Sequence, residues 1–350
     1  MSANVNASVS GRGGTGATQL DADGLQAYLR HVLPELEGLS VERVWRNVGG
    51  MSRETWFADV SWGDGGERVE GRYTIRLDHP KGSVVPVPLW WEYRVLEALY
   101  GSEVPVARPV AFEVNSSWLG RAPFYVRETV PGTASPSELY APGREEFRRE
   151  IGAQFAGLLA RVHTFDWQAS GLTDFMPVPT NATECATLEL RRWRDHYRAR
   201  AVDPQPVMAE LFSYLEQNAP AEVSRVSLVW GDVGVGNFIF DGGRIVALTD
   251  WEQSHLGDPM KDWASALWRS VDALLPAEEL FEIYTEASGI PVNSDAIRYY
   301  LAFYDVECVC TSHPVVGEFL GGRTADATFA RLALGIPFYC QDHALRTLGW

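Results

Sequence analysis

The sequence has few cysteines, no long apolar run and a deficit of positive charge. Its four cysteines, in 350 residues, lack the paired C-x-x-C spacing of a metal or redox site, so we expect reduced thiols in a cytoplasmic protein. They are Cys185, Cys308, Cys310 and Cys340. No apolar stretch approaches the roughly 20 residues of a membrane span, so we expect no membrane contact. Lys and Arg total 30 against 46 Asp and Glu, and the net charge of −16 disfavours nucleic acid as a partner.

The first 19 residues are rich in Gly, Ser, Ala and Asn and have no apolar centre. They predict a disordered tail and not a signal peptide. The letters GRGGTG at 11–16 fit the dinucleotide pattern G-x-G-x-x-G, but no strand precedes them and no helix clearly follows. A flexible tail is therefore the preferred interpretation.

The next part of the chain predicts a small, mainly β unit. A helical pattern over 20–34 is followed by three β-type runs, a second helix and two more β-type runs. The strands are expected over 41–48, 54–62, 72–78, 108–114 and 123–130, and the second helix over 88–101. A Pro-, Gly- and Ser-rich segment over 131–143 marks a boundary.

Beyond this boundary the patterns are mostly helical, with short strands around 226–249. The helices are expected over 144–165, 186–201, 206–218, 260–275, 277–288, 294–310 and 328–345. The sequence thus predicts an α+β, two-lobed fold: a small β-rich lobe over 20–130 and a larger helical lobe over 131–350, with a cleft between them.

Polar side chains follow the short apolar runs of the stretch WGDVGVGNFIF, at 230–240. Asp232 lies in a Gly-rich loop, Asn237 begins a strand, and the turn DGG predicts a hairpin that returns to Asp250. We expect these three groups to meet at one rim. Mg²⁺ prefers such oxygen ligands, and a carboxylate can orient an attacking hydroxyl, so the pattern indicates phosphoryl transfer. The D-x-x-x-x-N spacing is that of the protein-kinase catalytic loop.

Residues 229–264, VWGDVGVGNFIFDGGRIVALTDWEQSHLGDPMKDWA, resemble the signature of the aminoglycoside phosphotransferase family, kinase-like enzymes that act on small molecules. The resemblance implies a protein-kinase-like fold with ATP and Mg²⁺ as cofactors. It makes Asp232 the catalytic base and Asn237 and Asp250 the Mg²⁺ ligands. Asp258 and Asp262 match positions that brace the catalytic loop.

The same resemblance assigns nucleotide contacts in the first lobe. VGGMSRET resembles the phosphate-covering turn, and RYTIRL places an arginine where the family has a phosphate-contacting cation. A glutamate on the following helix would pair with that cation, and the segment FYVRETVPG resembles the hinge that binds adenine through its backbone. The residues implied are Gly49, Gly50, Ser52, Arg76, Glu92 (with Glu97 as its rival), the carbonyl of Glu128 and the N–H of Val130.

Two departures from the family pattern stand out. Trp230 replaces the usual His of the H-G-D motif, and Arg76 stands where lysine is common, although the two cations differ in geometry. Both resemble a branch related to the kinase domains that are fused to acyl-CoA dehydrogenases. Neither departure removes Asp232, Asn237 or Asp250.

Structural interpretations compete for several residues. Asp232 could cap its own loop, and Arg76 could form a surface ion pair. His163 is expected to be a packed or capping residue and not a base. Five arginines on one helix form a solvated face or, alternatively, contact the phosphates of a CoA substrate: Arg191, Arg192, Arg194, Arg198 and Arg200. Aromatic residues expected near the acceptor are Trp263, Trp268, Tyr299, Tyr300 and Tyr304.

The resulting hypothesis is an ATP- and Mg²⁺-dependent phosphotransferase whose acceptor is a hydroxyl of a small molecule. A hydroxyacyl-CoA or another apolar alcohol is slightly favoured, followed by an aminoglycoside-type antibiotic. A catalytically silent, kinase-like protein that binds a nucleotide or partner is the alternative. A protein kinase ranks last, because no A-P-E-like segment follows Asp250.

Overall fold

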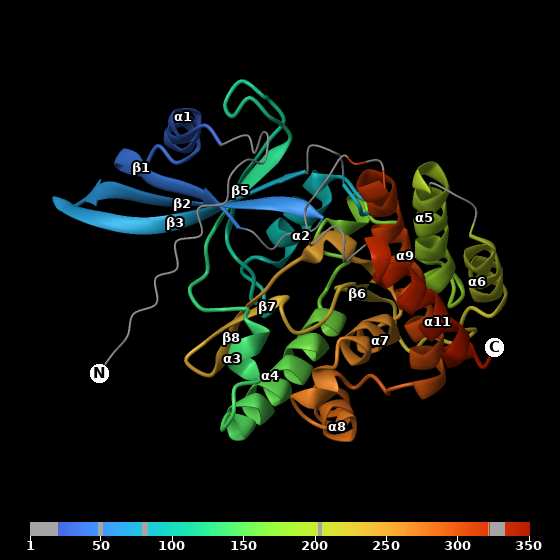
Figure 1. Ribbon diagram of the computed structural model, residues 1–350. Helices are drawn as coiled ribbons and strands as arrows, with labels where there is room; N and C mark the ends of the chain where they lie inside the picture. Colours follow the sequence, from blue (N-terminus) through green and yellow to red (C-terminus); the bar gives the residue numbers. More distant parts are fainter. Residues whose placement is uncertain (1–19, 48–51, 79–82, 202–204, 321, 323–332) are drawn as a thin grey trace, which may run out of the picture.

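The computed structural model describes residues 20–47, 52–78, 83–201, 205–320, 322 and 333–350. A small sheet-containing part and a larger helical part lie side by side (Figure 1). The predicted α+β, two-lobed class is therefore confirmed. No helix in the described ranges is both long enough and apolar enough to cross a bilayer.

The first part is an antiparallel five-stranded sheet in the order β1-β2-β3-β5-β4, and the predicted sequence of three strands, a helix and two strands is confirmed. Its elements are α1 (Ala22–Val32), β1 (Glu37–Arg46), β2 (Arg53–Asp64), β3 (Glu67–Asp78), α2 (Leu89–Leu99), β4 (Pro109–Glu113) and β5 (Phe124–Glu128). The β2–β3 hairpin turns on Gly65 and Gly66, whose φ angles of 56° and 91° suit a two-residue turn. Leu25, Tyr28 and Leu29 of α1 join the apolar core on one sheet face.

The helical part begins after β5. Its helices are α3 (Pro136–Leu139), α4 (Glu145–Thr164), α5 (Glu184–Arg200), α6 (Pro206–Gln217), α7 (Met260–Trp268), α8 (Ala277–Ser288), α9 (Ser294–Leu320) and α11 (Ile336–Leu348). The short strands are β6 (Ser227–Val229), β7 (Phe238–Asp241), β8 (Arg244–Leu248) and β9 (His255–Gly257). In Figure 1, α5, α6, α9 and α11 gather on one side and α4 and α8 at the base.

Three expectations for this part need correction. The helix expected over 260–275 ends at Trp268, because Ser270 adopts a left-handed φ of 58° that breaks it. The strand near 226–230 pairs with β9, a strand that the sequence patterns did not predict. Helix α9 extends to Leu320, ten residues beyond its expected end, with Pro314 inside it. Part of the helix expected over 328–345 lies outside the described residues.

Helix α2 joins the two parts. Its buried residues, including Leu89, Val95 and Leu99, belong to the same apolar core as the helical part. The indole N–H of Trp91 donates to the backbone carbonyl of Ser254 at 2.9 Å. Because α2 also carries Glu92, this packing fixes one wall of the cleft.

Candidate active site

The loop between β6 and β7 holds Asp232 and Asn237 together. The Asn237 side-chain amide donates to the Asp232 backbone carbonyl at 2.7 Å and to its Oδ2 at 2.8 Å. Gly231 and Gly236, at the ends of the loop, have φ angles of 97° and 106°, which residues other than glycine rarely adopt. The expected meeting of these two groups is therefore observed, and their roles as base and metal ligand stay predictions.

The two further aspartates of the signature have structural contacts. Asp262 is fully buried and accepts from the backbone N–H of Trp230 at 2.7 Å and of Gly231 at 2.8 Å. Asp258 accepts from the N–H of Met260, the first residue of α7, at 2.9 Å. Asp262 therefore braces the loop as expected, whereas the backbone contact of Asp258 is to α7.

Two side chains support this brace. His163 is buried, with Nε2 2.9 Å from Asp262 Oδ2 and Nδ1 2.8 Å from the Tyr284 hydroxyl, so it is a packed residue and not a base. Trp230, in the position of the family histidine, donates its indole N–H to the Thr249 carbonyl at 2.8 Å. The substituted residue thus links the loop to the segment that carries the second carboxylate.

Asp232 has two partners that the sequence did not assign to it: Arg269 was missed, and Tyr304 was expected only as an aromatic residue near the acceptor. Arg269 Nη1 and the Tyr304 hydroxyl both donate to Asp232 Oδ1, each at 2.6 Å. Burial raises the pKa of Asp232, but the Arg269 charge and the hydrogen bonds from Tyr304, Arg269 and Asn237 outweigh it, so the pKa lies below its ordinary value. The carboxylate is therefore held ionised and oriented. No local sequence signal marks partners that lie 37 and 72 positions away.

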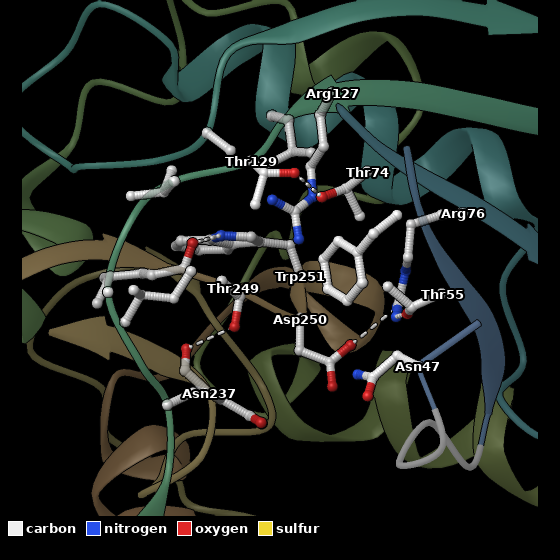
Figure 2. Close-up of a pocket in the computed structure, with 18 of the residues that line it drawn as sticks. Asn47, Thr55, Thr74, Arg76, Arg127, Thr129, Asn237, Thr249, Asp250 and Trp251 are labelled. Atoms are coloured by element: carbon white, nitrogen blue, oxygen red, sulfur yellow. Dashed lines mark hydrogen bonds and ion pairs between the residues drawn. The ribbon is translucent and has the colours of Figure 1, made fainter. Parts of the chain in front are cut away.

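The β7–β8 hairpin brings Asp250 to the same cleft as Asn237. The Thr249 N–H and hydroxyl donate to the Asn237 carbonyl at 2.8 Å and 3.0 Å. Asp250 follows with a left-handed φ of 65°, a strained conformation that is common at functional sites. Asn237 and Asp250 both line a cavity of about 740 Å³ between the two parts of the molecule (Figure 2). That size suits a nucleotide-sized ligand.

Arg76 faces this carboxylate from the sheet. Its Nη2 lies 3.2 Å from Asp250 Oδ1 and 3.3 Å from Glu92 Oε2, and its Nη1 donates to Thr55 Oγ1 at 2.9 Å. Glu92, only 3% exposed, is thus the partner on α2. Its rival Glu97 pairs with Arg94 on the surface. The surface-pair interpretation of Arg76 does not fit, because its side chain is 12% exposed.

A second arginine, also missed, completes this ionic cluster. The buried Arg53 donates to Glu92 at 3.2 Å and to Asp78 at 3.1 Å, and lies 3.3 Å from Glu252. Because Arg53 contacts Glu92 directly, it holds Glu92 in place independently of Arg76. Burial raises the pKa of Glu252, another carboxyl of this cluster, to about 8.

The expected nucleotide contacts of the first lobe have mixed outcomes. Gly49 and Gly50 lie outside the described residues, and Ser52 directly precedes β2. Val130 lines the cavity. The Glu128 side chain pairs with Arg108 at 2.8 Å, away from the cavity-lining set, and its backbone carbonyl accepts from Arg127 at 3.3 Å.

The cavity offers a suitable donor set for Mg²⁺. Among the described residues no group of three or more His, Cys, Asp and Glu could hold a metal by itself. Mg²⁺, however, usually binds one or two protein oxygens together with phosphate oxygens and water. Burial raises the pKa of Asp250, and the Arg76 charge offsets only part of that rise. A cation beside Asp250 would favour its ionised form, so Asn237 and Asp250 fit this role.

Three of the five arginines on helix α5 form ion pairs within the chain. Arg191 and Arg194 both pair with Glu216, at 3.7 Å and 2.7 Å, and Arg192 pairs with Glu189 at 2.5 Å. Two carboxylates thus serve three arginines, which favours the solvated-face interpretation for these three over contact with CoA phosphates.

Two of the five singled-out aromatic residues lie next to Asp232. Tyr304 donates to its carboxylate, and the Trp268 ring packs edge-on against Tyr304 at 5.3 Å. Trp263, Tyr299 and Tyr300 belong to the buried core. The surroundings of Asp232 on this side are therefore partly aromatic.

Comparison with known proteins places this geometry in a family. The model of the phosphotransferase enzyme family matches residues 47–294. Acyl-CoA dehydrogenase family member 10 of Mus musculus is 30% identical over 286 residues, covering 75% of this chain and 26% of that protein. Member 11 of Homo sapiens is 27% identical over 297 residues, covering 81% and 35%. The chain thus spans about a quarter to a third of the length of these relatives.

Solved structures share the fold. A putative aminoglycoside phosphotransferase from Ralstonia eutropha JMP134 superposes with a TM-score of 0.67 at 24% identity, covering 94% of this chain and 99% of that one. The macrolide 2'-phosphotransferase MphH from Brachybacterium faecium gives a TM-score of 0.55 at 17% identity, covering 90% and 97%. At such identities the likeness concerns the fold, and it confirms the predicted kinase-like architecture.

Proposed function

The chain belongs to the phosphotransferase enzyme family, and we propose that its cleft transfers a phosphoryl group from a Mg²⁺-bound nucleoside triphosphate to a hydroxyl of a small molecule. One observation carries the proposal: Asn237 contacts Asp232 directly, and Asn237, Asp250 and Arg76 line one cavity. ATP is the donor that the family resemblance implies. These contacts join a base, two oxygen ligands and a phosphate-binding cation.

Each group has a defined task. The ionised Asp232 orients the acceptor hydroxyl and accepts its proton as the bond to phosphorus forms. Asn237 and Asp250 would hold Mg²⁺, which when bound neutralises charge on the phosphate oxygens. Arg76 contributes a fixed positive charge on the opposite wall. Asp232 Oδ1 accepts from both Arg269 and Tyr304, whereas Oδ2 accepts from Asn237, so Oδ2 is the oxygen with room for a further donor, the hydroxyl.

For the acceptor we propose a hydroxyacyl-CoA or another apolar alcohol, with an aminoglycoside-type compound as the next candidate. Trp268 and Tyr304 beside Asp232 favour an acceptor with apolar surface. Arg191, Arg192 and Arg194 of α5 pair with glutamates of this chain, so CoA phosphates would compete with these glutamates for the three arginines. The complete set of Asp232, Asn237 and Asp250 argues against a catalytically silent protein.

The test is nucleotide consumption with Mg²⁺ across hydroxyacyl-CoAs, simple alcohols, macrolides and aminoglycosides. Asp232→Asn preserves size and should lower kcat by about 10²–10⁴ while nucleotide binding persists. Asp64→Asn, an exposed change at the far end of β2, is the matched control and should have no effect. Undiminished turnover in Asp232→Asn would remove that residue from its assigned role.

A further inference from the structure

One face of the arginine-rich helix α5 contacts the segment that leads into α2, the helix that carries Glu92. We infer that this face positions Arg76, the cation that the proposed function assigns to the triphosphate. Its residues are Arg192, His196 and Arg200. The inference rests on the proposed function and deepens it, because it makes three residues outside the cavity positioning residues for nucleotide binding.

Two of these residues hold consecutive backbone carbonyls of the segment before α2. Arg200 Nη1 donates to the Ser83 carbonyl, and His196 Nε2 lies 2.9 Å from the carbonyl oxygen of Val84. Residues four positions apart lie on the same face of a helix, so both bonds come from one side of α5. The two bonds join parts of the chain that are 117 and 112 positions apart.

The third residue holds the first turn of α2 itself. The Arg192 guanidinium lies over the Trp91 ring, 4.9 Å from its centroid, which is a favourable cation–π distance. The Trp91 indole also donates to the Ser254 carbonyl at 2.9 Å. Because Trp91 is thus held from two sides by the helical lobe, α5 and α2 are expected to move together.

His196 is a fixed hydrogen-bond donor at neutral pH. Burial and the Arg200 charge lower the pKa of His196 to about 4, so its ring is neutral. A neutral imidazole carries one N–H, and a carbonyl can only accept. The bond to Val84 therefore requires the proton on Nε2, and loss of that N–H would leave the carbonyl without this donor.

Arg53 connects the held segment to Arg76. Arg53 Nη2 donates to the Val87 carbonyl at 3.0 Å, and its Nη1 donates to Glu92 Oε2 at 3.2 Å. The same carboxylate oxygen lies 3.3 Å from Arg76 Nη2. A displacement of the segment before α2 would therefore move the partners that orient the Arg76 guanidinium.

The experiment is titration calorimetry of the full chain with ATP and Mg²⁺. His196→Phe keeps an aromatic ring without the N–H and should weaken ATP binding about three- to tenfold, as for loss of one hydrogen bond. His196→Gln can donate through its amide and should recover most of the affinity. Arg198→Met changes an exposed arginine of α5 outside this face and is the matched control, with unchanged affinity expected.

A double-mutant cycle with Arg76→Met separates positioning from a general loss of stability. If α5 acts through Arg76, His196→Phe should weaken ATP binding less than about twofold in the Arg76→Met protein. The same loss with and without Arg76 would overturn the inference, and so would wild-type affinity in His196→Phe.

Hydrogen exchange without nucleotide makes the contact testable independently of the proposed function. His196→Phe should speed exchange of the amides over 84–99 at least about threefold relative to those of β2, because local opening becomes easier. Unchanged exchange there would overturn the inference. A wild type that binds no nucleotide would end the proposed function, whereas faster exchange over 84–99 would still support the hold of α5 on this segment.

Discussion

Arg76 and Asp250 are separated by 174 positions in the sequence, yet Arg76 Nη2 donates to Asp250 Oδ1 across 3.2 Å. This contact joins the sheet to the hairpin across the cleft. It gives the carboxylate a cationic partner in the unliganded protein. A phosphate group would compete with Asp250 for the same guanidinium. Nucleotide binding should therefore weaken the contact between Arg76 and Asp250.

Arg76→Met removes the cation that faces the proposed phosphates. We expect the KM for the nucleotide to rise at least about tenfold, as for loss of a charge-assisted contact. Folding should persist, because Arg53 still pairs with Glu92. Steady-state kinetics together with thermal melting check both points. Arg76→Lys retains the positive charge but loses the planar guanidinium. Its KM for the nucleotide should therefore lie between the values for the wild type and Arg76→Met. An unchanged nucleotide KM in Arg76→Met would contradict the assignment.

Arg269→Ala should change the pH dependence of turnover. The Arg269 charge and hydrogen bonds hold the pKa of Asp232 below its ordinary value, so the base stays ionised as the pH falls. Without Arg269 the pKa of Asp232 rises, and the acid limb of kcat/KM should move to higher pH. Rate profiles for wild type, Arg269→Ala and Arg269→Lys test this, with Lys giving the smaller change. Superimposable acid limbs would show that Arg269 does not act through Asp232.

Gly231→Ala should destabilise the catalytic loop. Gly231 has a φ of +97°, and an added Cβ would lie 2.4 Å from the Gln253 carbonyl oxygen. Strain and collision together should cost more than about 2 kcal/mol of unfolding free energy and lower activity. Gly65→Ala is the matched control: its φ is +56° and nothing lies within 4 Å of the added carbon. It should cost about 1 kcal/mol. Equal losses of unfolding free energy in Gly231→Ala and Gly65→Ala, measured by denaturant unfolding, would refute the steric argument.

Asp258 should make stability fall as the pH rises. Burial raises the pKa of Asp258 from 3.8 to about 6, so the folded state binds this proton more tightly than the unfolded state does. Its contribution is therefore favourable at low pH and is lost between about pH 4 and 6. Relative to Asp258→Asn, the wild type should lose up to about 3 kcal/mol across that window. The unfolding free energies of the wild type and Asp258→Asn at pH 4 and 6.5 measure this loss. The same difference between the two proteins at both pH values would contradict the prediction.

The sequence predicted the meeting of Asp232, Asn237 and Asp250 because the signals are local. A Gly-rich loop and a D-G-G turn fix the hairpin geometry within about twenty residues. The strand and helix order of the first lobe was likewise readable from apolar periodicity, since the first five elements there are 10–12 residues long and the two five-residue strands are bounded by turn residues.

Arg269 and Tyr304 could not be predicted in the same way. The helical pattern over 260–275 continues through Arg269, and only the left-handed Ser270 ends the helix beside the loop. The contact of Tyr304 with Asp232 depends on how α9 packs against α7. Strand β9 was missed because three residues are too few for periodicity to show.

The indole bond from Trp230 to the Thr249 carbonyl has a mechanical consequence. Together with the bonds of Asn237 it links the loop of Asp232 to the segment of Asp250 inside the helical lobe. A shift of the sheet would then move Arg76 relative to Asp250 and leave the spacing of the base and the two metal ligands as it is. The helical lobe alone would set the geometry between the acceptor and the metal.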